Sequence, residues 1–512
     1  MKEQLLNFEK TEFGLILTSI FKIKKMCNEI KKILSILFLN FIMISGLSAA
    51  NFIVAPDGSG DFTSVQSAID ACPDGSRSFI FIKNGTYYGQ LSIGSKSVPT
   101  SKMISFIGEN KDSVILTYDV SLSTVSTFEQ ATTVQIYAKN FYAENITFQN
   151  SAGNTGQALA LYTAGDMSIF KNCTLKGYQD TYRSKKGTRG YFYNCWIEGA
   201  VDFIYAGGTL FFDDCTIYCT RSGGYVTAPE DAYATIPKAS TATGIFIRLG
   251  FLFRNCTIKG PESVPANSFY LGRPWGDYAG SIYLNCKLSY QVNSAGWATM
   301  GSSTYLTSCF AEYNSMDLNG NPIDISKRIS WSYQLQKSDA DNLLTTAAVY
   351  SRSYTSTFDP ATSLIQTGEP QNLFLNNSTL SWNNVEGASG YVIYNNGKIL
   401  GYSTTNSFTI SKPASTISVR AVNTTGVLSE ASSVLSAIKT VNESKVQVKV
   451  SGNKIEFSEP VAFNLYAVNG KSIAFSKDLV SQTKTKGITN GIYLIQLFDS
   501  SNQSKQFKIV VF

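Results

Sequence analysis

Two aspartates, Asp180 and Asp202, occupy the same place in two matching phrases of the sequence. Each follows a cysteine by seven residues, in NCTLKGYQD and in NCWIEGAVD. In a chain coiled into stacked parallel strands, this spacing places one carboxylate above the other, about 4.8 Å away. Two acids so close cannot both ionise freely, so one is biased towards keeping its proton. Such a pair can divide the roles of nucleophile and general acid.

Two glutamines share this spacing. Gln157 and Gln179 are separated by the same interval as the two aspartates, and Gln179 directly precedes Asp180. Amide N–H groups on successive turns can stabilise an oxyanion. Further along, Arg273 can hold a carboxylate in place by bidentate pairing, and Trp275 adds a flat aromatic ring. Together these residues predict acyl transfer, in which one aspartate attacks a carbonyl carbon and the other moves the proton.

The composition excludes several classes of site. The sequence has no histidine, which rules out a Ser-His-Asp or Cys-His site and any imidazole acid or base. Nine cysteines are present without a CxxC pair, so we expect no zinc site. The net charge of +6 over 512 residues is too small to imply nucleic acid or a membrane surface as a partner.

The elements that position these residues are repeats. The phrases ENITF, KNCTLKG, YNCWIEG, DDCTIYC, RNCTIKG, LNCKLS and TSCFAE recur along residues 141–309. Their third residues are Ile146, Cys173, Cys195, Cys215, Cys256, Cys286 and Cys309. Most are separated by intervals typical of one solenoid turn, and the longer gap between Cys215 and Cys256 fits two turns.

Repeats of this length with short apolar strands predict a parallel β-helix. Asparagine before the interior residue favours a bend or an asparagine ladder. The cysteines are expected to form an interior stack rather than disulfides. A leucine-rich solenoid is the alternative, but its Leu-x-x-Leu-x-Leu phrases are missing.

The start of the chain is typical of a secretory leader over residues 1–50. Lysines over residues 22–32 precede an apolar run at 33–44 and the small residues before Asn51. Met26 is an alternative start. Directly after the leader, residues 64–72 form a predicted amphipathic helix with Val65, Ala68 and Ile69 inward, which could cap the first open turn.

The repeats belong to a predicted domain of residues 51–362. Its end, from about residue 310, is expected to contain loops and a short helix around 339–349. Residues 372–438 then alternate strands with glycine turns and resemble a fibronectin type III module, with Trp382, Tyr391 and Tyr394 as core aromatics. This module could be a spacer or could bind carbohydrate.

Residues 445–512 form another predicted small β-sandwich. They resemble the C-terminal sorting domain of type IX secretion substrates in gram-negative bacteria, through Asn469-Gly470-Lys471, Gly491-Ile492-Tyr493-Leu494 and the strand at 508–512. The resemblance implies contact with the secretion machinery and a secreted or cell-surface protein, from which this domain is either retained or removed.

Over roughly residues 51–350 the sequence closely resembles the pectin methylesterases. The main matching motifs are Gly156-Gln157-Ala158-Leu159-Ala160-Leu161, Tyr178-Gln179-Asp180-Thr181, Val201-Asp202-Phe203-Ile204 and Leu271-Gly272-Arg273-Pro274-Trp275. Supporting matches are Asp57-Gly58-Ser59-Gly60-Asp61-Phe62, Ile146-Thr147-Phe148-Gln149-Asn150 and Gly296-Trp297. Seven motifs in the family's order, with the spacings of the aspartates and glutamines kept, make this resemblance specific.

The resemblance implies an all-β protein built on a right-handed parallel β-helix, here followed by two small β-sandwich domains. It implies hydrolysis of the methyl esters of homogalacturonan (pectin) to pectate and methanol, without metal or cofactor, and we expect a monomer. The implied catalytic residues are Asp202 as nucleophile, Asp180 as general acid and base, Gln157 and Gln179 as oxyanion donors, and Arg273 as partner of Asp202. The implied substrate-binding residues are Trp275, Trp297 and Tyr178.

The sequence departs from the family pattern at a few positions. Tyr205-Ala206 replaces the usual Phe-Gly after Asp-Phe-Ile, Tyr182 replaces a leucine, and Gly89 replaces a glutamate. Ala206 could perturb the turn beside Asp202 if a positive φ is needed there. Two rival functions stay open: a β-helix polysaccharide lyase or galacturonidase, and a non-catalytic pectin-binding protein. Methanol release without chain cleavage separates the esterase from both.

Overall fold

The computed structural model describes residues 50–98, 100–232, 234–301, 304–352, 354–376, 378–411, 416–432, 435–436, 448–451, 454–467, 471–484, 491–498 and 504–511. The predicted leader therefore lies outside the described residues, apart from Ala50. Contacts divide the chain into two compact units, one up to Leu435 and one from Ser436. No described helix is long and apolar enough to cross a bilayer.

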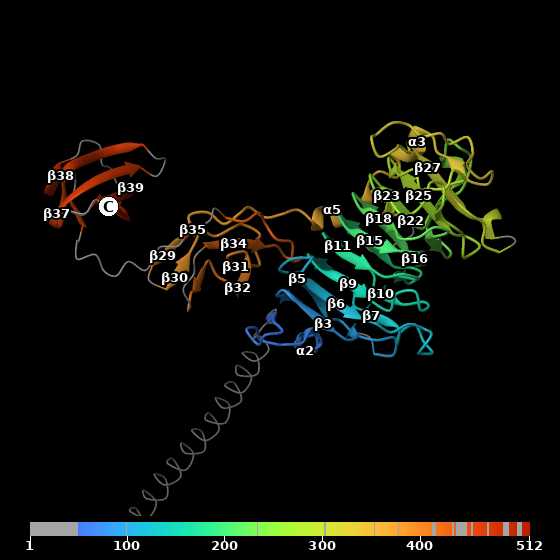
Figure 1. Cartoon of the computed structure of the whole chain (residues 1–512), viewed down its shortest axis with the longest axis horizontal. Helices are drawn as coiled ribbons and strands as arrows, with labels where there is room; N and C mark the ends of the chain where they lie inside the picture. The colour runs from blue at the N-terminus through green and yellow to red at the C-terminus, as the bar shows by residue number, and fades with distance from the viewer. Residues whose placement is uncertain are drawn as a thin grey trace, which may run out of the picture. The chain divides into compact units, whose positions relative to one another are not determined.

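The first unit contains the predicted parallel β-helix, whose strands stack in chain order (Figure 1). The eleven-stranded sheet consists of β1 (Asn51–Val54), β2 (Arg77–Ile82), β5 (Met103–Gly108), β8 (Tyr142–Glu144), β11 (Ser168–Lys171), β14 (Arg189–Tyr193), β17 (Thr209–Asp213), β22 (Phe251–Arg254), β25 (Gly280–Leu284), β27 (Cys309–Tyr313) and β28 (Tyr333–Gln334). The eight-stranded sheet consists of β3 (Gly85–Tyr88), β6 (Val114–Tyr118), β9 (Thr147–Asn150), β12 (Thr174–Lys176), β15 (Trp196–Gly199), β18 (Thr216–Cys219), β23 (Thr257–Lys259) and β26 (Lys287–Leu288). The seven-stranded sheet consists of β4 (Leu91–Ile93), β7 (Thr132–Ile136), β10 (Leu159–Thr163), β13 (Tyr182–Ser184), β16 (Val201–Ala206), β19 (Tyr225–Pro229) and β24 (Tyr270–Gly272).

The interior of the coil is built from columns of like residues, because parallel pairing in register repeats each position once per turn. One column is aromatic: the Phe170 and Phe192 rings lie 4.6 Å apart at 8°, and the stack continues through Phe212 and Phe253. A second column contains the cysteines. The Cys195 thiol donates to the Phe170 carbonyl one turn below, and the described cysteines are all free and buried. This confirms the predicted interior stack.

The asparagines before the interior residues form the predicted ladder. Asn172 Nδ2 donates to Asn145 Oδ1 at 2.5 Å, and Asn314 Nδ2 donates to Asn285 Oδ1 at 2.9 Å. These four residues have φ between 49° and 59°, the left-handed region that asparagine tolerates.

The strand register corrects two details of the predicted repeat. Cys309 pairs with Gly280, and Asn314 occupies the ladder position instead, so the phrase TSCFAE was aligned one strand too early. The longer gap before Cys256 is one turn rather than two, since Leu210 of β17 pairs directly with Phe251 of β22. The extra length is an excursion that holds the antiparallel pair β20 (Ala234–Ile236) and β21 (Ile247–Leu249) and the 3-10 turn η1 (Lys238–Ser240).

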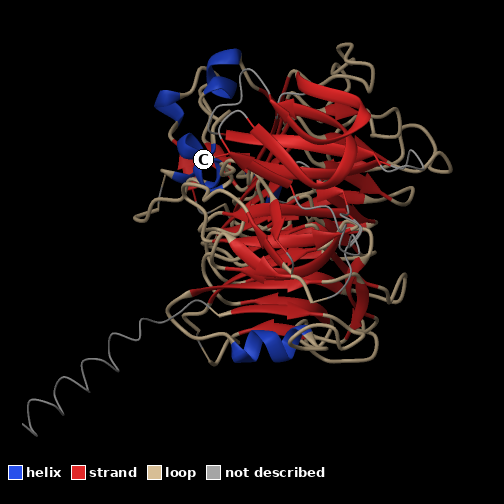
Figure 2. Ribbon diagram, turned by 90° about the vertical axis from the view of Figure 1, so that its left-hand side faces the viewer, coloured by secondary structure: helices blue, strands red, loops and turns tan. Residues whose placement is uncertain are grey.

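The open first turn is covered by helix α2 (Val65–Ala71), as predicted. Ser64 caps the helix by accepting a hydrogen bond from the Ser67 amide, and Val65, Ala68 and Ile69 are buried in the main core. In Figure 2 this helix lies across the lower end of the stacked strands. The helix therefore covers apolar surface of the first turn that would otherwise be exposed to solvent.

The segment after the last turns is mostly irregular, with the 3-10 turn η2 (Thr304–Leu306) and the short helices α3 (Lys337–Asp341), α4 (Thr346–Tyr350) and α5 (Pro360–Ser363). It is anchored on the outside of the eleven-stranded sheet. Tyr350 is fully buried there, and its hydroxyl donates to the Gly190 carbonyl at 2.5 Å. Arg189 forms an ion pair with Asp166 and donates to the Ser356 carbonyl at 2.6 Å.

The next part of the first unit has two antiparallel sheets. One contains β29 (Phe374–Asn376), β30 (Thr379–Ser381) and β33 (Ser407–Thr409), and the other β31 (Gly390–Asn395), β32 (Lys398–Ser403), β34 (Thr416–Val422) and β35 (Leu435–Ser436). Trp382 and Tyr391 pack in the core between them, with ring centroids 5.1 Å apart. Tyr394 differs from the prediction, because it lies in a separate cluster shared with the β-helix.

This cluster docks the module on the β-helix. Phe79, Phe81 and Ile107 point outward from β2 and β5 and are buried by the module, with the Phe81 ring stacked on Tyr402 at 4.8 Å. Ser105 Oγ also donates to the Thr425 carbonyl at 2.5 Å. The module is therefore attached to the β-helix by side-chain packing as well as by the linker. A module that acted only as a spacer would need the linker alone.

Removing the module should destabilise the coil. A chain of residues 51–362 is expected to unfold at a lower temperature than one of residues 51–435, because Phe79, Phe81 and Ile107 become exposed at a cost of about 1.5–3 kcal/mol each. Thermal unfolding followed by circular dichroism measures the difference. Equal midpoints for the two chains would show that the docking contributes nothing to stability.

The second unit has five described antiparallel strands: β36 (Val448–Ser451), β37 (Lys454–Ala467), β38 (Ser472–Lys484), β39 (Gly491–Phe498) and β40 (Ser504–Val511). They belong to a single sheet, whose core includes Phe463, Leu465 and Ile495. Asn469 and Gly470 of the predicted hairpin lie outside the described residues, while 491–494 lie in β39.

Candidate active site

The predicted glutamines and aspartates lie where three neighbouring strands of the seven-stranded sheet, β10, β13 and β16, begin. Isolated parallel bridges pair Gln157 with Gln179 and Gln179 with Val201, so these residues lie in register on three successive turns. Asp180 and Asp202 each come one residue later. The register therefore places the two carboxylates on adjacent turns, beside the two glutamines.

The backbone around the aspartates is unusual. Asp180 and Asp202 have φ of 65° and 49°, a left-handed conformation that aspartate adopts more readily than most residues. Ala206, at the end of β16, has φ of 74°. Alanine in this region costs about 1–2 kcal/mol, so Ala206 occupies a position that favours glycine. The chain nevertheless keeps the turn.

Asp202 forms a bidentate pair with Arg273, the residue after β24. Arg273 Nε donates to Asp202 Oδ1 at 2.9 Å, and Nη2 donates to Oδ2 at 2.6 Å. The guanidinium lies over the Tyr225 ring, 3.9 Å from its centroid, and the Arg273 amide donates to the Thr227 carbonyl. Both oxygens of Asp202 are thereby held in a fixed orientation.

Asp180 has a different environment. It is buried, with 7% of its surface exposed, and no described residue donates a hydrogen bond to its carboxyl group. Burial and then the nearby charge of Asp202 raise the pKa of Asp180 to about 8, although Arg183 and Arg273 act in the opposite direction. Asp180 is therefore protonated at neutral pH and can donate a proton, as the spacing predicted for one of the two acids.

The glutamine amides are available as donors. Gln157 and Gln179 are both partly exposed, and neither side chain has a hydrogen-bond partner among the described residues. Amides without an internal partner, beside a buried acid and an oriented carboxylate, can receive the negative charge of a tetrahedral intermediate. The arrangement can therefore carry out acyl transfer.

The two tryptophans have different environments. Trp275 follows Arg273 and Pro274, has 41% of its surface exposed, and lies 6.0 Å from the Tyr205 ring. Trp297, in contrast, is fully buried beside Tyr283 and Phe310, so it offers no face to a sugar in this structure. This departs from its expected substrate-binding role, because the loop over residues 289–298 folds the ring into the core. Tyr178 is partly exposed, next to Gln179.

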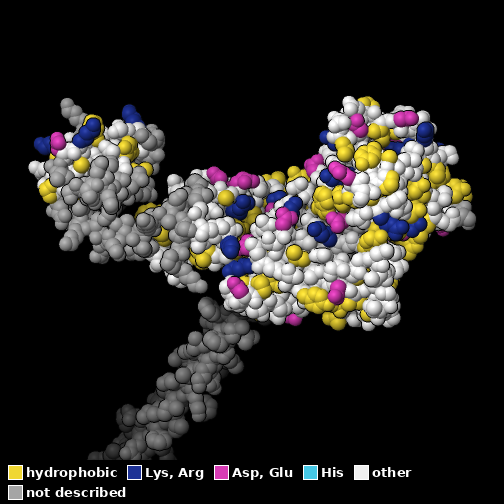
Figure 3. All heavy atoms as spheres, viewed as in Figure 1, with side chains coloured by type: hydrophobic (Ala, Val, Ile, Leu, Met, Phe, Trp, Pro, Cys, Tyr) yellow, Lys and Arg dark blue, Asp and Glu magenta, His cyan; other side chains and the backbone are white. Residues whose placement is uncertain are grey.

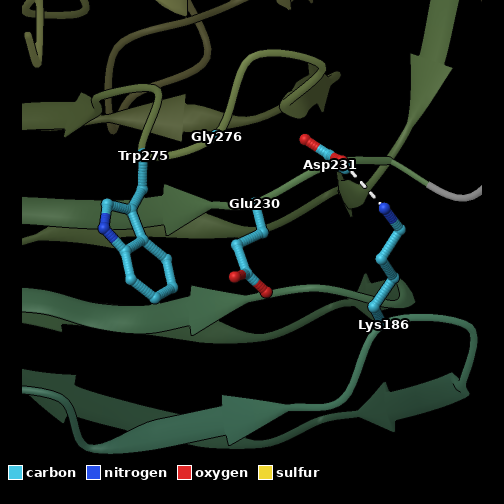
Figure 4. A pocket seen from close by; sticks show the side chains of 5 residues that line it. All are labelled: Lys186, Glu230, Asp231, Trp275 and Gly276. Atoms are coloured by element: carbon cyan, nitrogen blue, oxygen red, sulfur yellow. Dashed lines mark hydrogen bonds and ion pairs between the residues drawn. The ribbon is translucent and has the colours of Figure 1, made fainter.

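A small pocket of about 150 Å³ adjoins Trp275. It is lined by Lys186, Glu230, Asp231 and Gly276 as well as the tryptophan. Figure 4 shows the indole and the Glu230 carboxylate on one side and the ion pair of Lys186 with Asp231, at 2.8 Å, on the other. Charged groups therefore flank the aromatic surface beside the site.

Sequence reasoning missed Arg183. This residue lies on β13 between Tyr162 of β10 and Tyr205 of β16, its partners in the strand register. Its charge acts on Asp180. The sequence did contain a signal for this residue. Arg183 comes three residues after Asp180 and is the second residue of β13, between two buried residues, so strand alternation places its side chain on the outer face of the sheet.

No cluster of His, Cys, Asp and Glu that could hold a metal ion occurs in the described part of the chain. Over the face in Figure 3, side chains of both charge signs are interspersed. The candidate site therefore consists of two carboxylates, two amides and an arginine, with an exposed indole beside them.

The chain is similar to proteins of one known family. The family model described as Pectinesterase matches residues 51–352. Pectinesterase 4 of Arabidopsis thaliana is 31% identical over 293 residues, which are 55% of this chain and 47% of that protein. A pectinesterase of Daucus carota is 32% identical over 287 residues, covering 55% of this chain and 86% of the relative.

Among solved structures, pectin methylesterase from carrot superposes with a TM-score of 0.50 at 28% identity, and covers 61% of this chain and 98% of that one. The chain spans about half the length of the first curated relatives that it matches. The matched region contains the whole of the geometry described above.

Proposed function

The chain belongs to the pectinesterase family, and on this basis we propose that it hydrolyses the methyl esters of homogalacturonan to pectate and methanol. The observation that carries the proposal is the pair of aspartates with opposite environments. Asp202 is oriented by the bidentate Arg273, whereas the pKa of Asp180 is raised to about 8 by burial and by the charge of Asp202.

In the first half-reaction, Asp202 attacks the carbonyl carbon of the methyl ester. The negative charge that forms on the carbonyl oxygen is stabilised by the amides of Gln157 and Gln179. The bond from carbon to the methoxy oxygen then breaks as Asp180 gives its proton to that oxygen. Methanol leaves, and the sugar carboxyl group is joined to Asp202 as an anhydride.

In the second half-reaction, Asp180 is ionised and acts as a base. It takes a proton from a water molecule that attacks the anhydride carbon, and the bond to Asp202 breaks. The products are a free galacturonate carboxyl group, a regenerated Asp202 and a protonated Asp180. Protons balance over the cycle, and the chemistry uses only groups of the described site.

The substrate is proposed to lie along the outward side of the seven-stranded sheet. The exposed face of Trp275 suits stacking against a sugar ring, and Tyr178 lies next to the proposed oxyanion donor Gln179. Because Trp297 is buried, we assign the stacking role to Trp275 alone.

The decisive experiment follows methanol and polymer length together. The purified chain is incubated with highly methylated pectin, methanol is assayed, and chain length is measured by size-exclusion chromatography. We expect methanol without shortening of the polymer. Shortened chains without methanol would indicate a lyase or galacturonidase, and binding without either product would indicate a pectin-binding protein.

We propose the following organisation for the rest of the chain: a leader over 1–50, the catalytic domain over 51–362, a fibronectin type III-like module over 372–438 and a sorting-like domain over 445–512. The two antiparallel sheets around Trp382 support the assignment of the fibronectin type III-like module. The antiparallel sheet of the second unit supports the last. The protein is proposed to be an exported monomer, secreted or held at the cell surface.

A further inference from the structure

Arg183 lies in an aromatic cage on the outward side of the seven-stranded sheet. Its guanidinium carbon is 5.0 Å from the centre of the Phe128 ring, 5.3 Å from that of Tyr162 and 5.8 Å from that of Tyr205. Three rings around one guanidinium hold the side chain in place by packing and cation–π contact. The charge is therefore fixed in position, which reduces the entropy lost when a ligand binds.

The caged charge has no counter-ion among the residues that the structure describes. No described residue forms a hydrogen bond or ion pair with the Arg183 side chain. Burial raises the pKa of both Tyr162 and Tyr205, so these phenols stay neutral. Glu129 and Glu230 act electrostatically on Tyr162, but neither reaches Arg183 as an ion pair in the described part of the chain.

Arg183 is exceptional in this chain. Each of the nine other arginines donates at least one hydrogen bond within the described structure. A partly buried guanidinium has five N–H donors, and leaving them without acceptors is unfavourable. The donors of Arg183 therefore remain available to an acceptor that is not part of the chain.

Arg183 lies close to the candidate active site, so an acceptor bound to Arg183 would also lie close to that site. The charge of Arg183 acts on Asp180, and the Tyr205 ring that borders the cage is 6.0 Å from the Trp275 ring. The same strand register that aligns Asp180 with Asp202 aligns Arg183 with Tyr205. An acceptor at Arg183 thus lies beside the place where a sugar would sit on Trp275.

We propose that Arg183 binds a free carboxylate of a sugar acid, on a galacturonate unit next to the one whose ester is hydrolysed. The proposal deepens the function proposed above and rests on it. Along homogalacturonan a methylated unit is neutral and a hydrolysed unit is anionic, so only the hydrolysed unit pairs with a guanidinium.

The test is a binding measurement that needs no turnover. Unmethylated oligogalacturonate is titrated calorimetrically into the full chain, the Arg183→Met variant and the Arg420→Met variant. Methionine keeps an apolar stem among the three rings and removes the charge. Arg420 lies in β34 of the fibronectin type III-like module and donates to the Ser429 carbonyl, so its replacement gives the same change in net charge away from the site.

We expect Arg183→Met to weaken binding about tenfold to a hundredfold, the range for a hydrogen bond to a charged group, and Arg420→Met to bind like the wild type. Equal affinity of the wild type and Arg183→Met, or an equal loss in both variants, would overturn the proposal. Circular dichroism of Arg183→Met establishes that the variant is folded.

A second measurement distinguishes recognition of the carboxylate charge from a general loss of affinity for the oligomer. The same titrations are made with fully methylated oligomer in an Asp202→Asn background. The ratio of the affinities for the two oligomers should fall about tenfold or more when Arg183 is replaced. An unchanged ratio would show that Arg183 does not recognise the carboxylate. If the wild-type chain released no methanol, the proposed function would fail, while both titrations would still report on Arg183.

Discussion

Replacing Asp202 with asparagine is expected to lower the rate of methanol release by about 10⁴-fold or more, because the proposed nucleophile is removed. The change is isosteric, and the amide oxygen of the new side chain can still accept one of the two hydrogen bonds from Arg273. The loss should therefore appear in kcat rather than in folding. Initial rates of methanol release from highly methylated pectin measure it.

The matched control for this variant is Asp112→Asn. Asp112 is an exposed aspartate in a turn after β5, so the same chemical change there should leave the rate within about twofold. Thermal unfolding of both variants establishes that they are folded. If Asp202→Asn kept near-normal activity, the nucleophile would have to be another residue.

The features that were predictable from the sequence are those set by local repetition. A cysteine and an asparagine recur once per turn, and this pattern alone predicted the interior stack and the ladder. The spacing of Asp180 and Asp202 within their matching phrases also predicted that the two lie on adjacent turns, because parallel pairing keeps residues of neighbouring turns in register.

The features that were missed depend on contacts between distant segments. The burial of Trp297 depends on how a loop folds over Tyr283, about which the motif Gly-Trp carries no information. The cage of Arg183 needs Phe128 from a separate loop as well as two neighbouring strands. Tyr394 lies three residues after Tyr391 in β31, so strand alternation places it on the opposite face, where it packs in the cluster that contains Phe79 of the β-helix.

Cys309 shows a different limit. The phrase around Cys309 resembles the earlier repeats, and matching by cysteine placed it on the ladder. Strand pairing instead aligns Cys309 with Gly280, at the start of a strand rather than after one. A residue type identifies an interior position only when the strand register is also known, because a shift of register changes the face on which every side chain of the strand lies.

Replacing Asp180 with asparagine should lower the rate by about 10²–10⁴-fold, the contribution of general acid–base catalysis, and should also remove a limb of the pH profile. Asp180 acts first as an acid, so the active form of the free enzyme carries its proton. Its pKa is raised to about 8 by burial and by the charge of Asp202. Wild-type kcat/KM is therefore expected to hold below this pKa and to fall as the pH rises through about 8.

The measurement is the dependence of kcat/KM on pH for wild type and Asp180→Asn, corrected for alkaline ester hydrolysis in a blank without enzyme. Asparagine carries no titratable proton, so the residual activity of the variant should show no decline near pH 8. A limb that persists unchanged in Asp180→Asn would assign the titration to another group. A wild-type profile without a decline near pH 8 would mean that the protonated form of Asp180 is not required, and the roles of the two aspartates would have to be revised.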